Sequence, residues 1–150
     1  MNKAIAVPNR PPAIPMQEYT ASCHCQKLRI RFSMKIDQIW LCNCTICDMR
    51  GGHWVYFPEE YLEILSGRAH LQAYLYNTRT CKNMFCNHCG THVYAHARSL
   101  PGQCAIKLQC VDGFSDELIQ KHLCNMDGLN WANGQAEVRE KEGYKEEGNK

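Results

Sequence analysis

Clustered cysteines constrain this chain more than any other feature of its sequence. Seven of them fall into three clusters, which are Cys23-His24-Cys25, Cys42-Asn43-Cys44-Thr45-Ile46-Cys47 and Cys86-Asn87-His88-Cys89. Cysteines two or three positions apart can place two thiolates from one tight turn on a single ion. Zinc suits such sites because it is borderline-soft and accepts tetrahedral sulfur ligands. The spacing therefore predicts a small domain organised around metal.

The total cysteine count also argues against a disulfide scaffold. The chain has 11 Cys in 150 residues, and an odd number cannot be fully paired within one chain. An export signal needs an apolar stretch of about 7–15 residues, whereas the apolar run at residues 4–7 stops at Pro8. The predicted compartment is therefore the reducing cytoplasm, where grouped cysteines indicate metal rather than disulfides.

The clustered cysteines divide into four ligands and three. A closed set of four thiolates is structural, whereas three thiolates leave one tetrahedral position open, as in catalytic zinc sites. The two short clusters pair to form the closed site, and the middle cluster forms the open one. The predicted ligands are Cys23, Cys25, Cys86 and Cys89 for the first zinc, and Cys42, Cys44 and Cys47 for the second. Two alternatives stay open, namely one structural zinc with spare buried cysteines, or an iron–sulfur cluster.

Four cysteines lie outside the clusters. These are Cys81, Cys104, Cys110 and Cys124, which we interpret as small core residues. Cys81 precedes the third cluster by five residues, so it could approach the metal region.

Hydrophobic patterning predicts a mainly β domain over residues 19–132. Residues 28–34 alternate strictly between apolar and polar side chains, as a half-buried strand does. Shorter runs at 53–57, 71–76, 91–96 and 105–111 indicate further strands. At most one short helix is expected, with Ser115 as its N-cap and Asp116 and Glu117 in its first turn.

The two ends of the chain differ in composition from the central domain. Residues 1–18 hold four of the six prolines and are predicted to be an extended arm. Residues 133–150 are rich in Glu and Lys and are predicted to be a charged, flexible tail. The formal charge of +2 is too small to indicate nucleic acid as a partner. No apolar run approaches the roughly 20 residues of a membrane helix, so no membrane partner is expected.

The clusters and their neighbours also resemble a known family. The resemblance is carried by Ser22 before the first cluster, Gly51-Gly52 after the second, and Phe85 and Gly90-Thr91 around the third. Over about residues 20–131 the chain is similar to the glutathione-dependent formaldehyde-activating enzymes, whose domain is shared with centromere protein V. This resemblance implies a zinc-containing β-tent fold of antiparallel sheets. It also implies that the first and third clusters bind a structural zinc and the middle cluster a catalytic one, giving two zinc ions per chain.

The resemblance implies a carbon–sulfur lyase that acts on glutathione–aldehyde adducts of the S-hydroxymethylglutathione type. Glutathione is then the co-substrate, and its partners are small thiols and aldehydes. For a proton shuttle we favour His53 over His88 and Tyr56, because it follows the middle cluster closely. The two carboxylates of glutathione call for basic side chains, for which the candidates are Arg50, Arg79 and Lys82.

The sequence is also compatible with two alternative functions. Asn43 and Asp48 stand where the family often has His and Arg, so a lyase for a different thiol conjugate is one alternative. The other is a non-catalytic, zinc-stabilised binding module like centromere protein V. It ranks lower because 17 Lys and Arg are balanced by 15 Asp and Glu, without a long basic extension. Exposed edge strands would also allow a homodimer.

Overall fold

The described part of the chain, residues 11–145 of a computed structural model, folds into two β-sheets. The smaller sheet has the order β1-β2-β5, with β1 at Ile14–Ser22, β2 at Arg29–Ile36 and β5 at Glu63–Ser66. The larger sheet has the order β10-β3-β4-β9-β8-β7-β6. Its strands are β3 (Ile39–Cys42), β4 (Trp54–Pro58), β6 (Leu71–Tyr74), β7 (Lys82–Cys86), β8 (His92–His96), β9 (Gln103–Lys107) and β10 (Leu123–Met126). Strand pairs are antiparallel apart from β10 with β3, so the predicted mainly β fold is confirmed.

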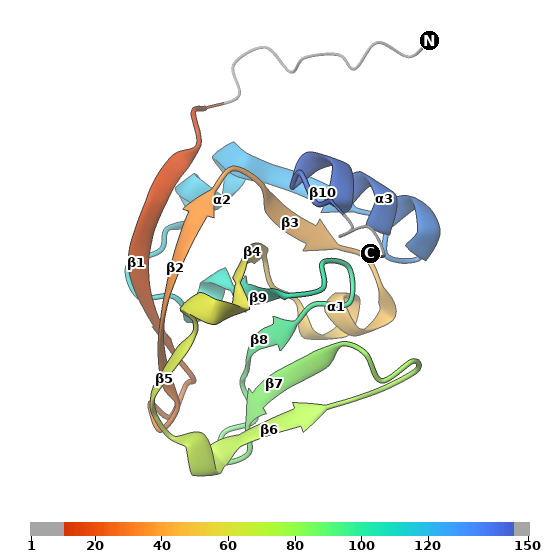
Figure 1. The fold of residues 1–150 in the computed structure, drawn as a ribbon. Coiled ribbons are helices and arrows are strands. Elements are labelled where there is room, and N and C mark those ends of the chain that lie inside the picture. Colours follow the sequence, from red (N-terminus) through yellow and green to blue (C-terminus); the bar gives the residue numbers. More distant parts are fainter. Residues whose placement is uncertain (1–10, 146–150) are drawn as a thin grey trace, which may run out of the picture.

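The main core lies between the two sheets. The alternation predicted in β2 is confirmed, because Ile30, Phe32, Met34 and Ile36 are all buried while the residues between them are more exposed. Phe32 stacks on Phe57 of β4 at a centroid distance of 4.7 Å, which joins the small sheet to the large one. Figure 1 shows β1 and β2 along one side, with the large sheet running from β3 and β10 to β6 and β7.

Helices are more numerous than the sequence predicted. The described residues contain three α-helices, namely α1 (Thr45–Arg50), α2 (Asp116–His122) and α3 (Trp131–Lys141). The short 3₁₀ helices are η1 (Glu59–Tyr61), η2 (Arg68–His70) and η3 (Leu108–Cys110). Only α2 was expected, and its predicted cap is confirmed because the Ser115 side chain accepts a hydrogen bond from the Leu118 backbone N–H. None of the helices within the described range is long and apolar enough to cross a membrane.

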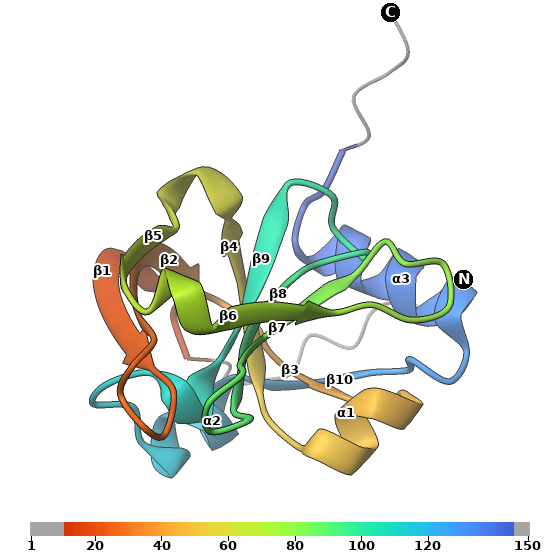
Figure 2. The same cartoon turned by 90° about the horizontal axis from the view of Figure 1, so that it is seen from below.

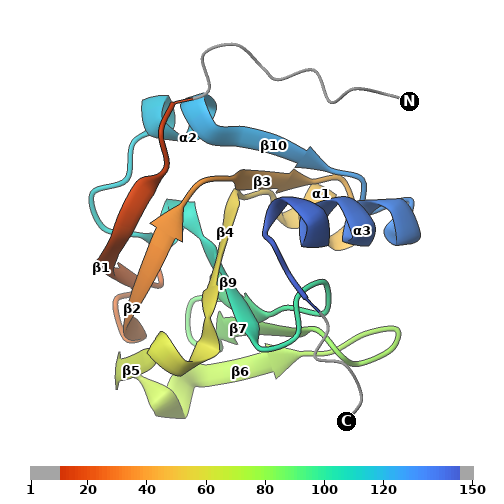
Figure 3. The same ribbon diagram turned by 45° about the horizontal axis from the view of Figure 1, so that its top comes forward.

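Up to residue 145, the C-terminal segment is not the solvated tail that the sequence predicted. Helix α3 packs beside β10 and β3 (Figure 3), and its Val138 is fully buried with Trp40, Trp54 and Met126 in a second apolar cluster. Gly134 lets the helix approach the preceding loop, since a Cβ there would lie 2.3 Å from the Asp127 carbonyl oxygen. The prediction failed because one buried valine is too weak a signal to register as an amphipathic pattern. Residues 146–150 lie outside the described range.

The N-terminal arm is shorter than predicted. Strand β1 begins at Ile14 and pairs with β2 as far as Ser22, with an irregularity between Ile14 and Gln17. Pro15 falls at that irregularity in a strand at the edge of its sheet, where proline is tolerated because no ladder hydrogen bond is lost. The part of the arm over residues 1–10 lies outside the described range.

Candidate metal centres and active site

The first and third cysteine clusters meet in one group. Cys23 and Cys25 follow β1, whereas Cys86 ends β7 and Cys89 lies in the turn before β8. The Cys23 and Cys25 sulfurs are 3.5 Å apart, and those of Cys25 and Cys86 are 3.7 Å apart. All four sulfurs lie within 4.8 Å of one another. Two sulfurs that share a tetrahedral zinc at about 2.3 Å are about 3.8 Å apart, so this group could hold the ion.

Burial explains why this group is suited to a structural ion. Cys23 and Cys86 are almost completely buried, and Cys23 also accepts a hydrogen bond from the Leu28 backbone N–H at 3.3 Å. Burial raises the pKa of Cys23 to about 12. A bare thiolate is therefore disfavoured here, and a bound cation would supply the charge that stabilises it.

The middle cluster forms a second group on its own. Cys42 ends β3, Cys44 is the N-cap of α1, and Cys47 lies in its first turn. Their three sulfurs also lie within 4.8 Å of one another. Because Cys42 and Cys47 donate hydrogen bonds to Cys44, the pKa of Cys44 falls to about 2, while that of Cys42 rises to about 11. The cluster thus concentrates negative charge at one point, where a cation would be stabilised.

A loop after β10 holds the middle cluster in place. Asn43 donates to the Asp127 carboxylate at 3.2 Å, and its side-chain oxygen accepts from the Leu129 backbone N–H at 3.1 Å. Gly128 passes so close that a Cβ there would lie 2.6 Å from the Cys42 sulfur. The sequence did not indicate either role, because both depend on a segment more than 80 residues away.

A cavity of about 250 Å³ opens beside the middle cluster. Cys42 and Cys47 line it from β3 and α1, and Trp40, Trp54 and Tyr56 form an aromatic wall. Figure 2 shows α1 and α3 on the same side of the molecule, with β3 between them. Two of the three cysteines of the middle cluster therefore border a space that a small substrate can enter.

His92 is one of the residues lining this cavity that the sequence analysis did not single out. It is only 6% exposed, and neither of its ring nitrogens has a hydrogen-bond partner among the described residues. Burial lowers its pKa to about 3, with the charges of Arg50 and Lys107 adding to the effect. The imidazole is consequently neutral at physiological pH and has one free N–H and one free acceptor nitrogen. An unpartnered buried polar atom costs stability. Trp54, whose Nε1 also has no partner among the described residues, lines the same cavity, so the wall offers unused polar atoms to a bound molecule.

The predicted proton shuttles lie elsewhere or are already engaged. His53 does not line the cavity, and its Nδ1 accepts from the Gln109 side chain at 2.7 Å. His88 is exposed and lies against His70 beside the four-cysteine group. Tyr56 does line the cavity, with its hydroxyl 2.7 Å from that of Ser99, and burial raises its pKa.

Of the three basic residues predicted to bind glutathione, one lines the cavity and two do not. Arg50 lines the cavity from the end of α1, and its guanidinium lies 5.4 Å from the centre of the Tyr74 ring. Arg98, which the sequence did not single out, lines it from the β8–β9 loop and lies over the Trp131 ring at 4.5 Å. Arg79 and Lys82 are exposed and do not line the cavity.

Cys81 lines the same cavity as Cys42 and Cys47. Burial raises its pKa, and the negative charge of Cys44 adds to the effect. The expectation that this cysteine could approach the metal region thus agrees with its place, although it belongs to neither sulfur group.

Together these features define a class of protein: a mainly β domain with two cysteine groups able to hold metal, one with two of its four cysteines buried and one beside a cavity. The sequence profile of the glutathione-dependent formaldehyde-activating enzymes matches residues 18–125, and the chain belongs to this family. The matched range contains both cysteine groups.

A solved structure has the same fold. The crystal structure of a Rhodobacter sphaeroides protein superposes with a TM-score of 0.65 at 24% sequence identity. The match covers 69% of this chain and 97% of that one. At this identity the likeness supports the fold and says nothing about the reaction.

Proposed function

We propose that this protein is a carbon–sulfur lyase that acts on adducts of glutathione with a small aldehyde, of the S-hydroxymethylglutathione type. The single observation that carries the proposal is the three-sulfur group of Cys42, Cys44 and Cys47 at the wall of a cavity that also holds Arg50 and neutral His92. Family membership supports the same chemistry.

The sulfurs of the middle cluster suit a zinc ion with one open position. Three thiolates within 4.8 Å of one another match the ligand set of an open tetrahedral site. When bound there, zinc would take the sulfur of a thiol substrate and favour its thiolate form. The four-cysteine group would hold a second, structural zinc.

Cationic side chains in the cavity would orient glutathione. Arg50 and Arg98 approach from opposite elements, α1 and the β8–β9 loop. A guanidinium binds a carboxylate through two parallel hydrogen bonds, which fixes direction as well as position. The two carboxylates of glutathione are therefore matched by two arginines at the cavity wall.

His92 would act on the aldehyde oxygen. In the forward direction the thiolate sulfur bonds to the aldehyde carbon, the C=O bond becomes single, and the oxygen takes up the proton that the thiol lost. The reverse reaction breaks the same carbon–sulfur bond. A neutral imidazole with an unused N–H can donate a hydrogen bond to the oxygen as its charge develops, without an energetic cost for reorganisation.

Replacing His92 with leucine separates this role from a packing role. We expect turnover to fall by roughly 10²-fold, as when one donor to a developing oxyanion is lost. The free energy of unfolding should stay the same or rise, because the wild-type ring nitrogens lack partners. Steady-state kinetics and urea denaturation of the same preparations measure both. The His53→Leu variant tests the alternative donor. If His53→Leu loses turnover and His92→Leu does not, the hydrogen-bond donor to the aldehyde oxygen is His53.

The binding mode is tested by replacing the metal with Co²⁺, whose visible spectrum responds to its ligands. Adding glutathione should change the spectrum if its sulfur becomes a ligand at the middle cluster. S-methylglutathione has the same carboxylates but no thiol, and should leave the spectrum unchanged. Equal responses to the two ligands, or none to either, would show that the thiol does not reach the metal.

The environment of Asn43 favours a second candidate, a lyase for another thiol conjugate. Both ends of its amide hydrogen-bond to the loop after β10, and Asn43 does not line the cavity, so it does not take the place of a base beside the substrate. Comparing turnover of glutathione, cysteine and coenzyme A adducts of formaldehyde distinguishes the two candidates. A preference for an adduct other than that of glutathione would select the second.

A further inference from the structure

A third group of donor atoms lies outside both cysteine groups. It consists of Glu59 at the start of η1, His96 at the end of β8 and Cys104 in β9. Strand β9 lies between β4 and β8, and Cys104 is directly opposite His96 on β8. A backbone hydrogen bond from the Glu59 N–H to the Gly102 carbonyl, at 3.1 Å, fixes η1 against the same hairpin. Three separate segments thus bring these side chains together.

The distances are those of a metal site. The His96 Nδ1 lies 3.6 Å from the Cys104 sulfur and 3.3 Å from a Glu59 carboxylate oxygen, and all three donors lie within 4.8 Å of one another. Donors on a tetrahedral zinc are about 3.5 Å apart for sulfur and nitrogen and about 3.3 Å for nitrogen and oxygen, given bonds of about 2.3, 2.0 and 2.0 Å. The four-cysteine group shows similar spacing, with sulfurs 3.5 and 3.7 Å apart.

The arrangement does not fit a nucleophilic Cys–His–Glu relay. Such a relay needs the thiol and the carboxylate on opposite nitrogens of the imidazole, so that one nitrogen receives a proton while the other is held. Here both the Cys104 sulfur and the Glu59 oxygen face Nδ1. One nitrogen cannot give a directional hydrogen bond to both, whereas a cation between the three donors would contact each of them.

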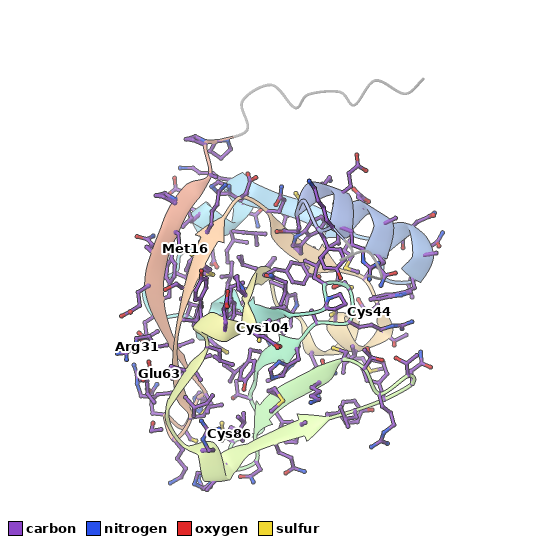
Figure 4. All side chains as sticks on the ribbon, in the orientation of Figure 1. Met16, Arg31, Cys44, Glu63, Cys86 and Cys104 are labelled. Carbon is purple, nitrogen blue, oxygen red and sulfur yellow. The ribbon has the colours of Figure 1, made fainter. Side chains whose placement is uncertain are left out.

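We propose that Glu59, His96 and Cys104 form a third metal site, which takes a zinc-type divalent ion. The mixed sulfur, nitrogen and oxygen donors suit zinc. Three protein ligands leave one position for water, and the site is reached from the side of Glu59 and His96, whose side chains are 53% and 33% exposed. Figure 4 shows Cys104 well separated from Cys44 and Cys86, which mark the other two groups.

An ion at this site would also stabilise one wall of the cavity. His96 and Cys104 stand at the two ends of the β8–β9 loop, and that loop carries Arg98 and Ser99 into the cavity wall. An ion held by both ends would brace the loop and hold these two side chains in place. The third ion is thus a clamp on the cavity wall rather than a second reaction centre.

Native mass spectrometry of the full chain, with zinc added in slight excess, tests the proposal. The wild type should carry one zinc more than Glu59→Ala and one more than His96→Phe, which keeps the ring contact with Tyr94. The Glu60→Ala variant is the matched control, because Glu60 is the exposed neighbour of Glu59 in η1 and belongs to no donor group. It should retain the full count.

Neither variant removes a buried side chain, so both should fold, which circular dichroism checks. The proposal requires that both variants lose the ion. A zinc count equal to that of the wild type in either variant overturns it, as does an equal loss in the Glu60→Ala control.

Discussion

The Cys44→Ser variant is expected to lose the metal of the middle cluster and nearly all turnover of S-hydroxymethylglutathione. Hydrogen bonds from Cys42 and Cys47 hold the pKa of the Cys44 thiol well below its usual value, so Cys44 is the sulfur of this cluster on which the thiolate is favoured. A serine hydroxyl does not ionise near neutral pH and cannot replace that charge. Loss of an outer hydrogen-bond partner of a metal ligand costs about 10–100-fold in activity, and loss of a ligand itself should cost more. Metal analysis and steady-state kinetics measure both effects.

The same variant should keep its fold. Helix α1 contributes no buried residue, so the middle cluster lies at the margin of the core. Cys124→Ser provides the control, because Cys124 lies in β10 close by and belongs to none of the three donor groups. It should retain metal and turnover. If Cys44→Ser turns over the adduct at the wild-type rate, the middle cluster is not the reaction centre.

The parts of this structure that could be predicted from the sequence depend on short-range patterns. The alternation in β2 and the cap at Ser115 are local, and both are confirmed. The grouping of the cysteines links residues more than 60 positions apart, yet it could be predicted because zinc chemistry limits how thiolates combine. Cysteine spacing therefore carried tertiary information that hydrophobic patterning does not contain.

What could not be predicted depends on contacts that leave no local trace. Helix α3 is held by Val138 and by the close approach at Gly134, and a charged sequence around one valine gives no amphipathic stripe. His92 resembles any other residue of a short strand, and only the fold shows that it is buried and lines the cavity that Cys42 and Cys47 border. The preference for His53 used distance along the chain, which does not measure distance in space.

The second large effect is expected at the four-cysteine group, where loss of one ligand should lower the stability of the fold. Cys86→Ser should lower the free energy of unfolding by more than about 4 kcal/mol, a loss that few single substitutions cause. The reason is that binding of a structural ion contributes directly to folding. Urea denaturation in the presence of zinc measures the loss. Chelation of the metal from the wild type should lower its stability in the same way.

Cys89→Ser separates a shared ion from ordinary packing. Cys86 is completely buried, whereas Cys89 is half-buried in the turn before β8. If the sulfurs only filled space, serine at Cys89 would cost no more than about 1 kcal/mol, and the two variants would differ widely. If the four sulfurs hold one ion, either substitution removes a ligand and the losses should be similar. A small effect of Cys89→Ser beside a large effect of Cys86→Ser would therefore mean that this group does not bind metal as a unit.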